Sequence, residues 1–324
     1  MSLPSQFPEP AGPEPAGAVA DAPKGNWVDL YAPQWTRPYL RLSRADRPIG
    51  TWLLYIPCLW ALALAGGAGG FTAWDLWLAL SCGVGAFLMR GAGCTWNDIT
   101  DRHIDGSVAR TRSRPIPSGQ VTVRQALVWM AVQTLVAGGI LLTYNRLAVG
   151  LGLASLALVA IYPFAKRFTW WPQVFLGLAF NWGAILLWAA HAGSLAPAAV
   201  LLYAAGIAWT LYYDTIYAHQ DREDDALIGV KSTARLFGDK SRAWLWGFFV
   251  LVMLLFAGAA VAAHAALMPL VVGLLGVWAM GWHIVGQMLR LDLDDPASCL
   301  AAFRANRNAG LIPVPFLAVA GWLG

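Results

Sequence analysis

Residues 76–105 read LWLALSCGVGAFLMRGAGCTWNDITDRHID, and this stretch combines the two features that decide the fold. Its first part, residues 76–96, contains one charged side chain, that of Arg90. A run of roughly 20 mostly apolar residues is long enough to cross a bilayer as an α-helix. The run then ends in a cluster of Asp, Asn and Arg side chains. The stretch therefore predicts a membrane-spanning helix that carries an acidic segment at its end.

The rest of the chain has the same apolar character. Of its 324 residues, 58% are hydrophobic and 12% are charged, and the mean hydropathy is +0.54. Soluble domains carry about a quarter charged residues, so this composition excludes a water-covered surface. We predict an all-α integral membrane bundle of about nine transmembrane helices, at residues 49–66, 76–96, 122–142, 147–164, 173–190, 197–217, 243–263, 267–289 and 307–323.

Basic residues alternate between the two ends of the predicted spans. The segment before the first span and the loops after the second, fourth, sixth and eighth spans are rich in Lys and Arg. In the other loops only Arg146 stands out. By the positive-inside rule, the N-terminus and the basic loops are cytoplasmic. The net charge of +4 is then mainly a consequence of topology, and we expect no nucleic-acid partner.

The N-terminal region differs from the rest. Residues 1–36 form a Pro- and Ala-rich tail that we predict to be disordered, and residues 37–324 form one membrane domain. Residues 1–26 contain a single basic residue, Lys24, and no apolar core, so no signal peptide is expected. The four cysteines lie in spans or on the cytoplasmic side, where disulfides are rare.

Two acidic segments follow the second and sixth spans. They read NDITDRHID at residues 97–105 and DTIYAHQDREDD at residues 214–225. Four spans separate them, so both lie at the cytoplasmic face. Residues four apart share one face of a helix at about 3.6 residues per turn. The acidic side chains therefore form two columns, one of Asn97, Asp101 and Asp105 and one of Asp214, Asp221 and Asp225.

These columns suit a divalent metal. Carboxylates stacked on one helix face repel each other unless a cation lies among them. Carboxylate and amide oxygens are ligands that suit Mg²⁺, which often binds through a few carboxylates together with substrate phosphates. The alternative is a set of solvated loop charges paired with nearby arginines. The repetition at one membrane face favours a site for Mg²⁺ and a diphosphate, since basic residues that suit phosphate oxygens follow both segments (Arg110, Arg112 and Arg114; Lys231 and Arg235).

A family resemblance is carried by these same segments. Residues 89–105 together with RTRSRP at 110–115 resemble the first motif of the UbiA superfamily of intramembrane aromatic prenyltransferases. Residues 213–225 with GVKSTA at 229–234 resemble its second motif. Further similarity lies at RPIGTW, YPFAK and FRAN (47–52, 162–166 and 303–306), so the resemblance covers nearly all of the chain from about residue 40. Within the superfamily, the chain is most similar to the 4-hydroxybenzoate polyprenyltransferases of ubiquinone synthesis.

The resemblance implies both a fold and a reaction. The fold is a helical bundle around a central cavity with cytoplasmic Asp-rich cap loops, in a bacterial inner membrane or an organelle inner membrane. The reaction is Mg²⁺-dependent transfer of a polyprenyl group from polyprenyl diphosphate to the ring of 4-hydroxybenzoate, ortho to the phenol. The implied metal ligands are Asn97, Asp101, Asp105, Asp221 and Asp225, with Asp98, Asp214 and Asp224 as weaker candidates, and the implied diphosphate ligands are Arg110 and Lys166, assisted by Lys231.

Arg90 lies within the second span, seven residues before Asn97 and on the same helix face. A charged residue inside a span is costly and usually faces a polar cavity. The alternative is that its side chain snorkels to the interface. The resemblance implies that Arg90 binds the carboxylate of the aromatic acceptor, which suits bidentate guanidinium recognition. Tyr162 either lines the same pocket or lies at the interface, and Arg47 either contacts substrate or anchors the topology.

Two other classes of function stay open. Intramembrane carboxylates often mark ion pathways, as in a transporter. The carboxylates here lie at span ends, and the predicted spans contain no Glu. The nearer alternatives are other prenyl transfers of the superfamily, of the haem, menaquinone or chlorophyll type. Arg90 and the two motifs favour a small carboxylated phenol, with Asp221 as a candidate for the base that takes the phenol proton.

Overall fold

The computed structural model describes residues 17–20, 22–66, 71–107, 111–227 and 229–324, without the side chain of residue 224. Within these ranges the chain is helical and contains no strand. The elements are α1 (Trp27–Tyr31), α2 (Arg37–Leu42), α3 (Ile49–Ala65), α4 (Ala73–Ser107), α5 (Val123–Leu141), α6 (Arg146–Phe168), α7 (Pro172–Phe180), α8 (Trp182–Ala192), α9 (Pro197–Ala218), the 3₁₀ helix η1 (His219–Asp221), α10 (Arg222–Leu227), α11 (Thr233–Phe237), η2 (Gly238–Lys240), α12 (Ser241–Ala263), α13 (Leu267–Arg290), α14 (Pro296–Leu311) and α15 (Pro313–Leu323).

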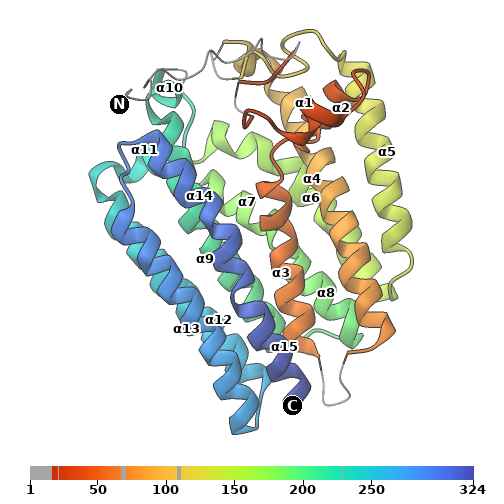
Figure 1. Cartoon of the computed structure of the whole chain (residues 1–324), viewed down its shortest axis with the longest axis vertical. Coiled ribbons are helices and arrows are strands. Elements are labelled where there is room, and N and C mark those ends of the chain that lie inside the picture. Colours follow the sequence, from red (N-terminus) through yellow and green to blue (C-terminus); the bar gives the residue numbers. More distant parts are fainter. Residues whose placement is uncertain (1–16, 21, 67–70, 108–110, 228) are drawn as a thin grey trace, which may run out of the picture.

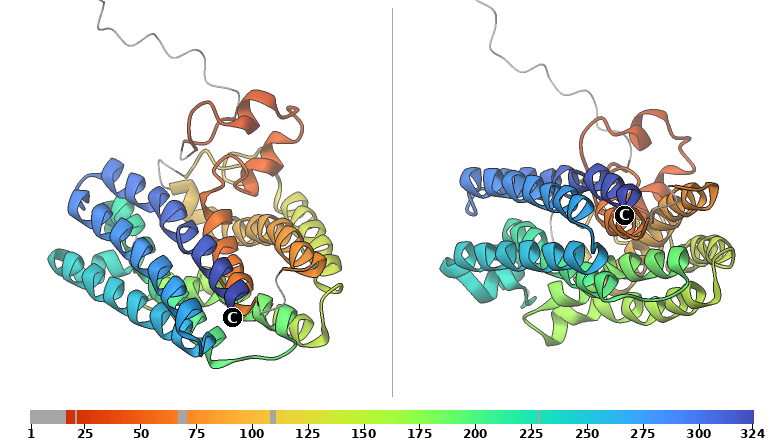
Figure 2. Two further views of the ribbon diagram at one scale, coloured as in Figure 1. Left: turned by 60° about the horizontal axis from the view of Figure 1, so that its bottom comes forward. Right: turned by 90° about the horizontal axis from the view of Figure 1, so that it is seen from below.

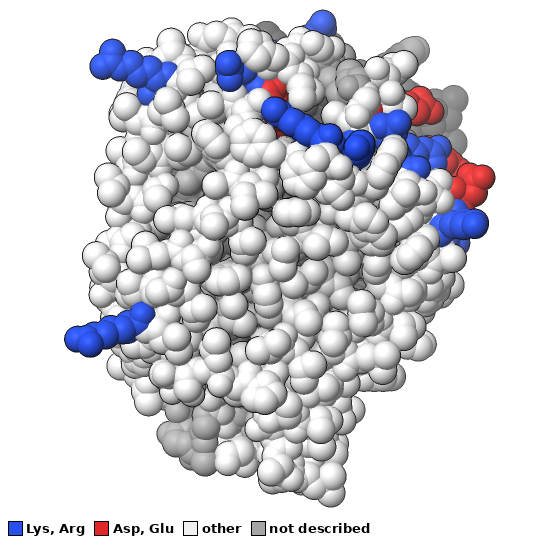
Figure 3. All heavy atoms as spheres, turned by 180° about the vertical axis from the view of Figure 1, so that it is seen from behind, with Lys and Arg blue, Asp and Glu red and all other residues white. Residues whose placement is uncertain are grey.

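The long helices run roughly along one axis. Helices α1, α2, α10 and α11 lie at one end of the molecule, and the C-terminus lies at the other (Figure 1). Seen from below, α12 to α15 form one side of the bundle and α4 and α5 form the other (Figure 2). On the face in Figure 3, most Lys, Arg, Asp and Glu side chains lie near the end that carries α1 and α2. The rest of that face is nearly uncharged, as the lipid-facing surface of a membrane protein must be.

Seven helical segments of the described chain are long and apolar enough to cross a membrane. This confirms the predicted all-α membrane bundle, but not the count of nine. The first predicted span is α3, which is apolar but only 17 residues long. The last predicted span is divided between the end of α14 and α15, because the helix breaks at Ile312 before Pro313, which has no backbone N–H to donate.

One predicted span is interrupted by an asparagine. Asn181 ends α7 and precedes α8, with a backbone outside the helical region. Its side-chain amide donates to the carbonyl of Gly177 at 2.8 Å and to the hydroxyl of Thr210 at 2.8 Å. These hydrogen bonds satisfy polar groups within the apolar part of the bundle, where an unpaired donor is expensive. The interruption separates α7 from α8 within one candidate span, Pro172–Ala192.

The core lies around α9, the candidate span with the largest buried share. Trp60 of α3 contacts Trp209 of α9 and Phe256 of α12, with ring centroids 5.0 and 4.8 Å apart. The indole N–H of Trp60 donates to the carbonyl of Gly310 at 2.6 Å, and that of Trp209 donates to Asn306 at 2.9 Å. Both buried donors are therefore satisfied. This packed side of the bundle supports the opposite side, where α4, α5, α6 and α8 surround a cavity.

The described residues include a helix that lies before the predicted domain boundary at residue 37. Helix α1 lies in the segment assigned to the tail, and Val28 within it is fully buried against Ala32 and Ala45. Asn26 caps this helix by accepting from the backbone N–H of Asp29. Residues 1–16 lie outside the described residues, so the division into tail and membrane domain stays a prediction.

Candidate active site

Two cavities lie one above the other in the bundle. The first, here called the apolar cavity, has a volume of about 560 Å³ and is lined by residues of α3 to α8 such as Cys58, Leu135 and Val159. The second, the polar cavity, has a volume of about 300 Å³ and lies at the end of the molecule that carries α10. Tyr162 lines both cavities. The two spaces therefore meet at this side chain.

The polar cavity brings the two acidic segments together. Asn97 and Asp105 come from α4, Asp221 from η1 and Asp225 from α10, and all four line the cavity. The predicted Asp-rich cap loops are therefore helical in the described residues. The first acidic segment simply continues α4 to Ser107, as its four-residue spacing indicates. Asp214 of α9, a weaker candidate, lines the same cavity.

Asp101 does not line the polar cavity. Its side chain is fully buried, with Oδ2 2.5 Å from the ammonium of Lys166 and Oδ1 3.2 Å from the guanidinium of Arg167. Lys166 itself lines the polar cavity. The predicted metal ligand Asp101 and the predicted diphosphate ligand Lys166 are thus an ion pair in this structure.

The donors of the polar cavity fit a hard divalent cation that binds together with a phosphate. The side chains of Asn97, Asp105, Asp221 and Asp225 offer oxygen atoms, the ligand type that Mg²⁺ prefers. Among the described residues no three His, Cys, Asp or Glu side chains form a ready-made metal cluster. This is compatible with Mg²⁺, which commonly takes only one or two carboxylates and completes its shell with water and substrate phosphate.

Basic side chains line the same cavity. Arg114 contacts Asp105 at 3.0 Å and Asp98 at 3.5 Å. The ammonium of Lys231 donates to the carbonyl of Phe168 at 3.4 Å, and the backbone N–H of Lys231 donates to the carbonyl of Lys166 at 3.2 Å. Together with Lys166, these cations suit an anionic ligand. Arg110, the other predicted diphosphate ligand, lies outside the described residues.

Arg90 faces the interior of the bundle. It lines the apolar cavity, and its guanidinium lies over the ring of Phe180 at 5.1 Å from the centroid. Its Nε is buried and has no hydrogen-bond partner among the described residues. The charge of the guanidinium acts on Asp214, which lines the polar cavity together with Gln173. A methyl group at Gly50 would overlap the Arg90 guanidinium, so a glycine at this position makes room for it.

The other two predicted substrate contacts differ in position. The hydroxyl of Tyr162 donates to the carbonyl of Gly93 at 3.1 Å, which holds the ring between the cavities. Arg47 lines neither cavity and lies 3.6 Å from Asp46. Sequence reasoning did not single out Phe180 or Gln173. The sequence contained a clue to Gln173, because a polar side chain at the start of an apolar span suggests that it has a partner inside the bundle.

A family model and curated relatives match the chain. The model described as the UbiA prenyltransferase family matches residues 54–310. The chain is 47% identical over 304 residues to the mitochondrial 4-hydroxybenzoate polyprenyltransferase of Homo sapiens, covering 94% of this chain and 80% of the relative. It is 46% identical over 290 residues to the protein of the same name from Arabidopsis thaliana, covering 89% and 70%.

Solved structures share the fold. A UbiA homolog from Aeropyrum pernix K1 in its apo form matches with a TM-score of 0.64 and 22% identity, over 83% of this chain and 97% of that one. A UbiA homolog from Archaeoglobus fulgidus bound to GPP and Mg²⁺ matches with a TM-score of 0.63 and 20% identity, over 88% and 98%. Sequence identities this low support a shared fold and nothing more. The family model, by contrast, matches most of the chain. This chain belongs to the UbiA prenyltransferase family.

Proposed function

We propose that this chain transfers a polyprenyl group from polyprenyl diphosphate to the ring of 4-hydroxybenzoate, ortho to the phenol, and releases diphosphate, in ubiquinone biosynthesis. The names and coverage of the relatives support this proposal. The observation that carries it is the junction of the two cavities. A partly buried arginine, Arg90, lines the apolar cavity, and a cavity lined by acidic and basic side chains adjoins it across Tyr162.

The substrates divide between the two cavities by their chemistry. The diphosphate belongs in the polar cavity, where Lys166, Lys231 and Arg114 offset its charge. The polyprenyl tail belongs in the apolar cavity, which removes its surface from water. The acceptor lies between them, with its carboxylate on the Arg90 guanidinium and its ring toward Tyr162. This arrangement brings the allylic carbon of the donor to the acceptor ring.

We propose Mg²⁺ as the metal, held by Asn97, Asp105, Asp221 and Asp225. When bound, Mg²⁺ neutralises the negative charge that develops on the departing diphosphate. For Asp101 we propose a role through Lys166, because its carboxylate already holds that ammonium. Asp101 then orients Lys166 toward the phosphate oxygens. This differs from the ligand role that the family resemblance implies.

The reaction exchanges an allylic C–O bond and a ring C–H bond for a ring C–C bond and an O–H bond on diphosphate. The allylic C–O bond breaks with both electrons going to the diphosphate oxygen, and the ring carbon ortho to the phenol attacks the allylic carbon. The ring C–H bond then breaks, its electron pair restores the aromatic ring, and its proton goes to the released diphosphate. The protein contributes position, charge stabilisation and exclusion of water, which would otherwise trap the allylic cation. Asp214 and Asp221 are the carboxylates of the polar cavity that we propose as acceptors of the phenol proton.

We place the protein in a bacterial inner membrane or an organelle inner membrane, with the polar cavity on the cytoplasmic or matrix side. The Lys and Arg residues around the α1 and α2 end support this orientation. The long apolar segments support the multi-pass assignment.

An acceptor panel tests the proposed function. Purified protein in lipid is incubated with Mg²⁺, a polyprenyl diphosphate and 4-hydroxybenzoate, 1,4-dihydroxy-2-naphthoate or haem, and products are identified by mass spectrometry. We expect a prenylated product with 4-hydroxybenzoate at a rate far above that of the other acceptors. If the protein prenylates another acceptor but not 4-hydroxybenzoate, it is still a prenyltransferase of this family, but the proposed substrate is wrong.

A further inference from the structure

We propose that Arg44 is a positioning residue for the polar cavity, acting through Asp98 on Arg114 and Asp105. The inference rests on the proposed function, because it assigns to this cavity the binding of a diphosphate with its metal. Arg44 lies before α3 and lines neither cavity. Its effect must therefore pass through the groups that it contacts.

A continuous chain of ion pairs joins Arg44 to the cavity wall. One guanidinium nitrogen of Arg44 donates to Asp98 Oδ1 at 2.6 Å. The same oxygen lies 3.5 Å from Arg114, whose Nη1 is also 3.0 Å from Asp105 Oδ2. Asp98 is completely buried and does not line the polar cavity, whereas Arg114 and Asp105 do. Asp98 thus shares its charge between two arginines, one of which faces the proposed ligand.

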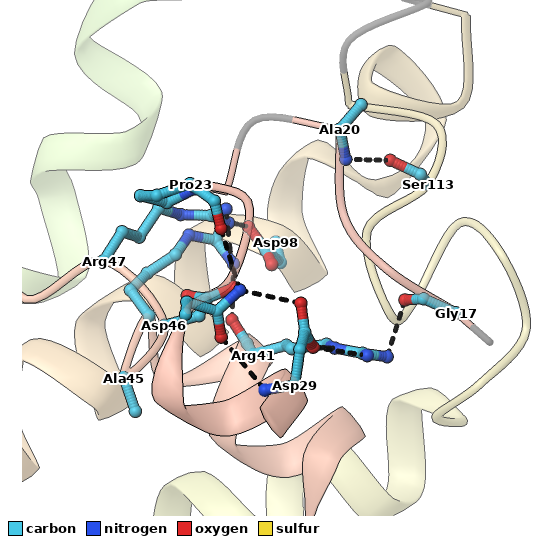
Figure 4. Close-up of polar contacts among 12 residues, drawn as sticks. Gly17, Ala20, Pro23, Asp29, Arg41, Ala45, Asp46, Arg47, Asp98 and Ser113 are labelled. Carbon is cyan, nitrogen blue, oxygen red and sulfur yellow. Dashed lines mark hydrogen bonds and ion pairs between the residues drawn. The ribbon is translucent and has the colours of Figure 1, made fainter. Parts of the chain in front are cut away.

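The segment that carries Arg44 is fixed at several points. The indole N–H of Trp27 donates to the carbonyl of Ala45 at 2.7 Å, next to Arg44. Arg41 forms a buried ion pair with Asp29 at 2.6 Å (Figure 4).

The chain that precedes α3 and carries Arg44 is also hydrogen bonded to the loop that holds Arg114. The backbone N–H of Ala20 donates to the hydroxyl of Ser113 at 2.9 Å, one residue before Arg114 (Figure 4). Arg41 donates to the carbonyl of Gly17 at 2.6 Å, and the amide of Gln120 donates to the same carbonyl at 3.3 Å. The two arginines on Asp98 are therefore presented by segments that are bonded to each other.

The backbone of Arg44 supports the same conclusion. Its φ is 59°, and among the described residues it is the one non-glycine residue with a positive φ. This left-handed conformation is uncommon for an L-residue and persists where the surroundings enforce it, often near functional sites. The conformation aims the guanidinium at Asp98, while its other nitrogen donates to the carbonyl of Arg41 at 3.1 Å.

The charges predict what Arg44 does for the site. With Arg44 present, Arg114 is shared between Asp98 and Asp105 and stays at the cavity wall. Without it, the buried Asp98 keeps Arg114 as an ion-pair partner and draws that guanidinium away from Asp105. The cavity then loses an oriented cation for the diphosphate, and the Asp105 carboxylate loses its orientation for the metal.

The test compares Arg44→Gln, Arg44→Lys and the double variant Arg44→Gln with Asp98→Asn in the full chain in lipid. The first readout is Mg²⁺-dependent binding of a polyprenyl diphosphate, and the second is the KM for each substrate. We expect Arg44→Gln to weaken diphosphate binding about tenfold or more and to raise the Mg²⁺ concentration for half-saturation, since it leaves the buried Asp98 carboxylate with Arg114 alone and so draws Arg114 from the cavity wall. The KM for the acceptor should change little. Arg44→Lys, which keeps the charge, should restore most of the binding.

A hydrogen-bonded pair of side chains at the other end of the bundle supplies the control. Asp75 and His191 lie 2.5 Å apart, far in sequence from both acidic segments. Asp75→Asn should lower thermal stability and leave diphosphate binding unchanged. If Arg44→Gln behaves like this control, Arg44 is only structural and the proposal is overturned.

Two further outcomes are separable. If Arg44→Gln fails to fold, the double variant Arg44→Gln with Asp98→Asn removes the buried charge together with its partner, so that Arg114 keeps Asp105 as its partner. Loss of diphosphate binding in a folded double variant would contradict the proposal. If wild-type protein binds the diphosphate but does not prenylate 4-hydroxybenzoate, the proposed substrate fails while the role of Arg44 is still measured by binding.

Discussion

The ammonium of Lys166 lies 2.5 Å from Oδ2 of Asp101, so the basic and acidic residues predicted to bind opposite charges of the substrate complex bind each other. Arg167 adds a second contact to the same carboxylate at 3.2 Å. A carboxylate with two cationic partners is poorly placed to accept a metal as well. Lys166 keeps its place at the wall of the polar cavity.

This relationship predicts different effects for two aspartates of one helix. Asp101→Asn should lower kcat/KM for the diphosphate about tenfold to a hundredfold, as removal of one partner of a buried charged pair does, with little change in the Mg²⁺ requirement. Asp105→Asn should raise the Mg²⁺ concentration for half-maximal activity. Magnesium titrations of both variants decide the roles. An equal rise in Asp101→Asn would restore Asp101 as a metal ligand.

Gly50 should control the acceptor site through Arg90. Gly50→Ala places a methyl group where the Arg90 guanidinium lies, so the side chain must move. We expect the KM for 4-hydroxybenzoate to rise about tenfold, the scale of one lost charged contact. Steady-state kinetics in each substrate separate this effect from the diphosphate site, whose KM should hold. Gly150→Ala, in open space on α6, is the matched control. Equal kinetics in the two variants would contradict the packing argument.

The apolar cavity should determine which prenyl donors are used. Gly85 lines this cavity, and a side chain there would meet open space. Gly85→Leu should therefore fill the cavity without disturbing the helices. The activity with a long polyprenyl diphosphate should fall more than that with geranyl diphosphate. Competition between the two donors, followed by mass spectrometry, gives the ratio directly. An unchanged ratio would place the tail elsewhere.

Metal removal should stop the reaction reversibly. The oxygen donors Asn97, Asp105, Asp221 and Asp225 line the polar cavity with no Cys or His among them. We expect EDTA to abolish product formation and excess Mg²⁺ to restore it, since such oxygen sites exchange hard cations readily. Product formation that persists in EDTA, at metal levels verified by elemental analysis, would remove the divalent metal from the account.

The helical membrane bundle, and the meeting of its two acidic segments at one end, could be predicted from local sequence patterns. Apolar runs of membrane length and carboxylates four residues apart depend only on helix geometry, which the sequence states directly. Asp101 shows the limit of that argument. It shares a helix column with Asn97 and Asp105, yet α6 supplies two cations on its side of α4. Which neighbour faces each residue depends on packing between helices distant in sequence.

The interruption at Asn181 and the role of Arg44 failed to emerge for the same reason. The helix break at Asn181 depends on a hydrogen bond to Thr210 of α9, and no residue next to Asn181 in the sequence indicates that a break occurs there. The basic residues before α3 indicated topology, but Arg44 contacts a carboxylate 54 positions away. A left-handed backbone at an arginine has no signal in the sequence. These features belong to tertiary structure.

The most direct test of the account compares 4-hydroxybenzoate with its neutral amide, 4-hydroxybenzamide, as acceptors for wild-type protein and for Arg90→Met. If the carboxylate of the acceptor binds Arg90 at the junction of the two cavities, wild-type protein should favour 4-hydroxybenzoate in kcat/KM by about a hundredfold. Arg90→Met should lose most of this preference while it retains the KM for the diphosphate. A variant that keeps the full preference for the carboxylate would contradict the proposed acceptor site.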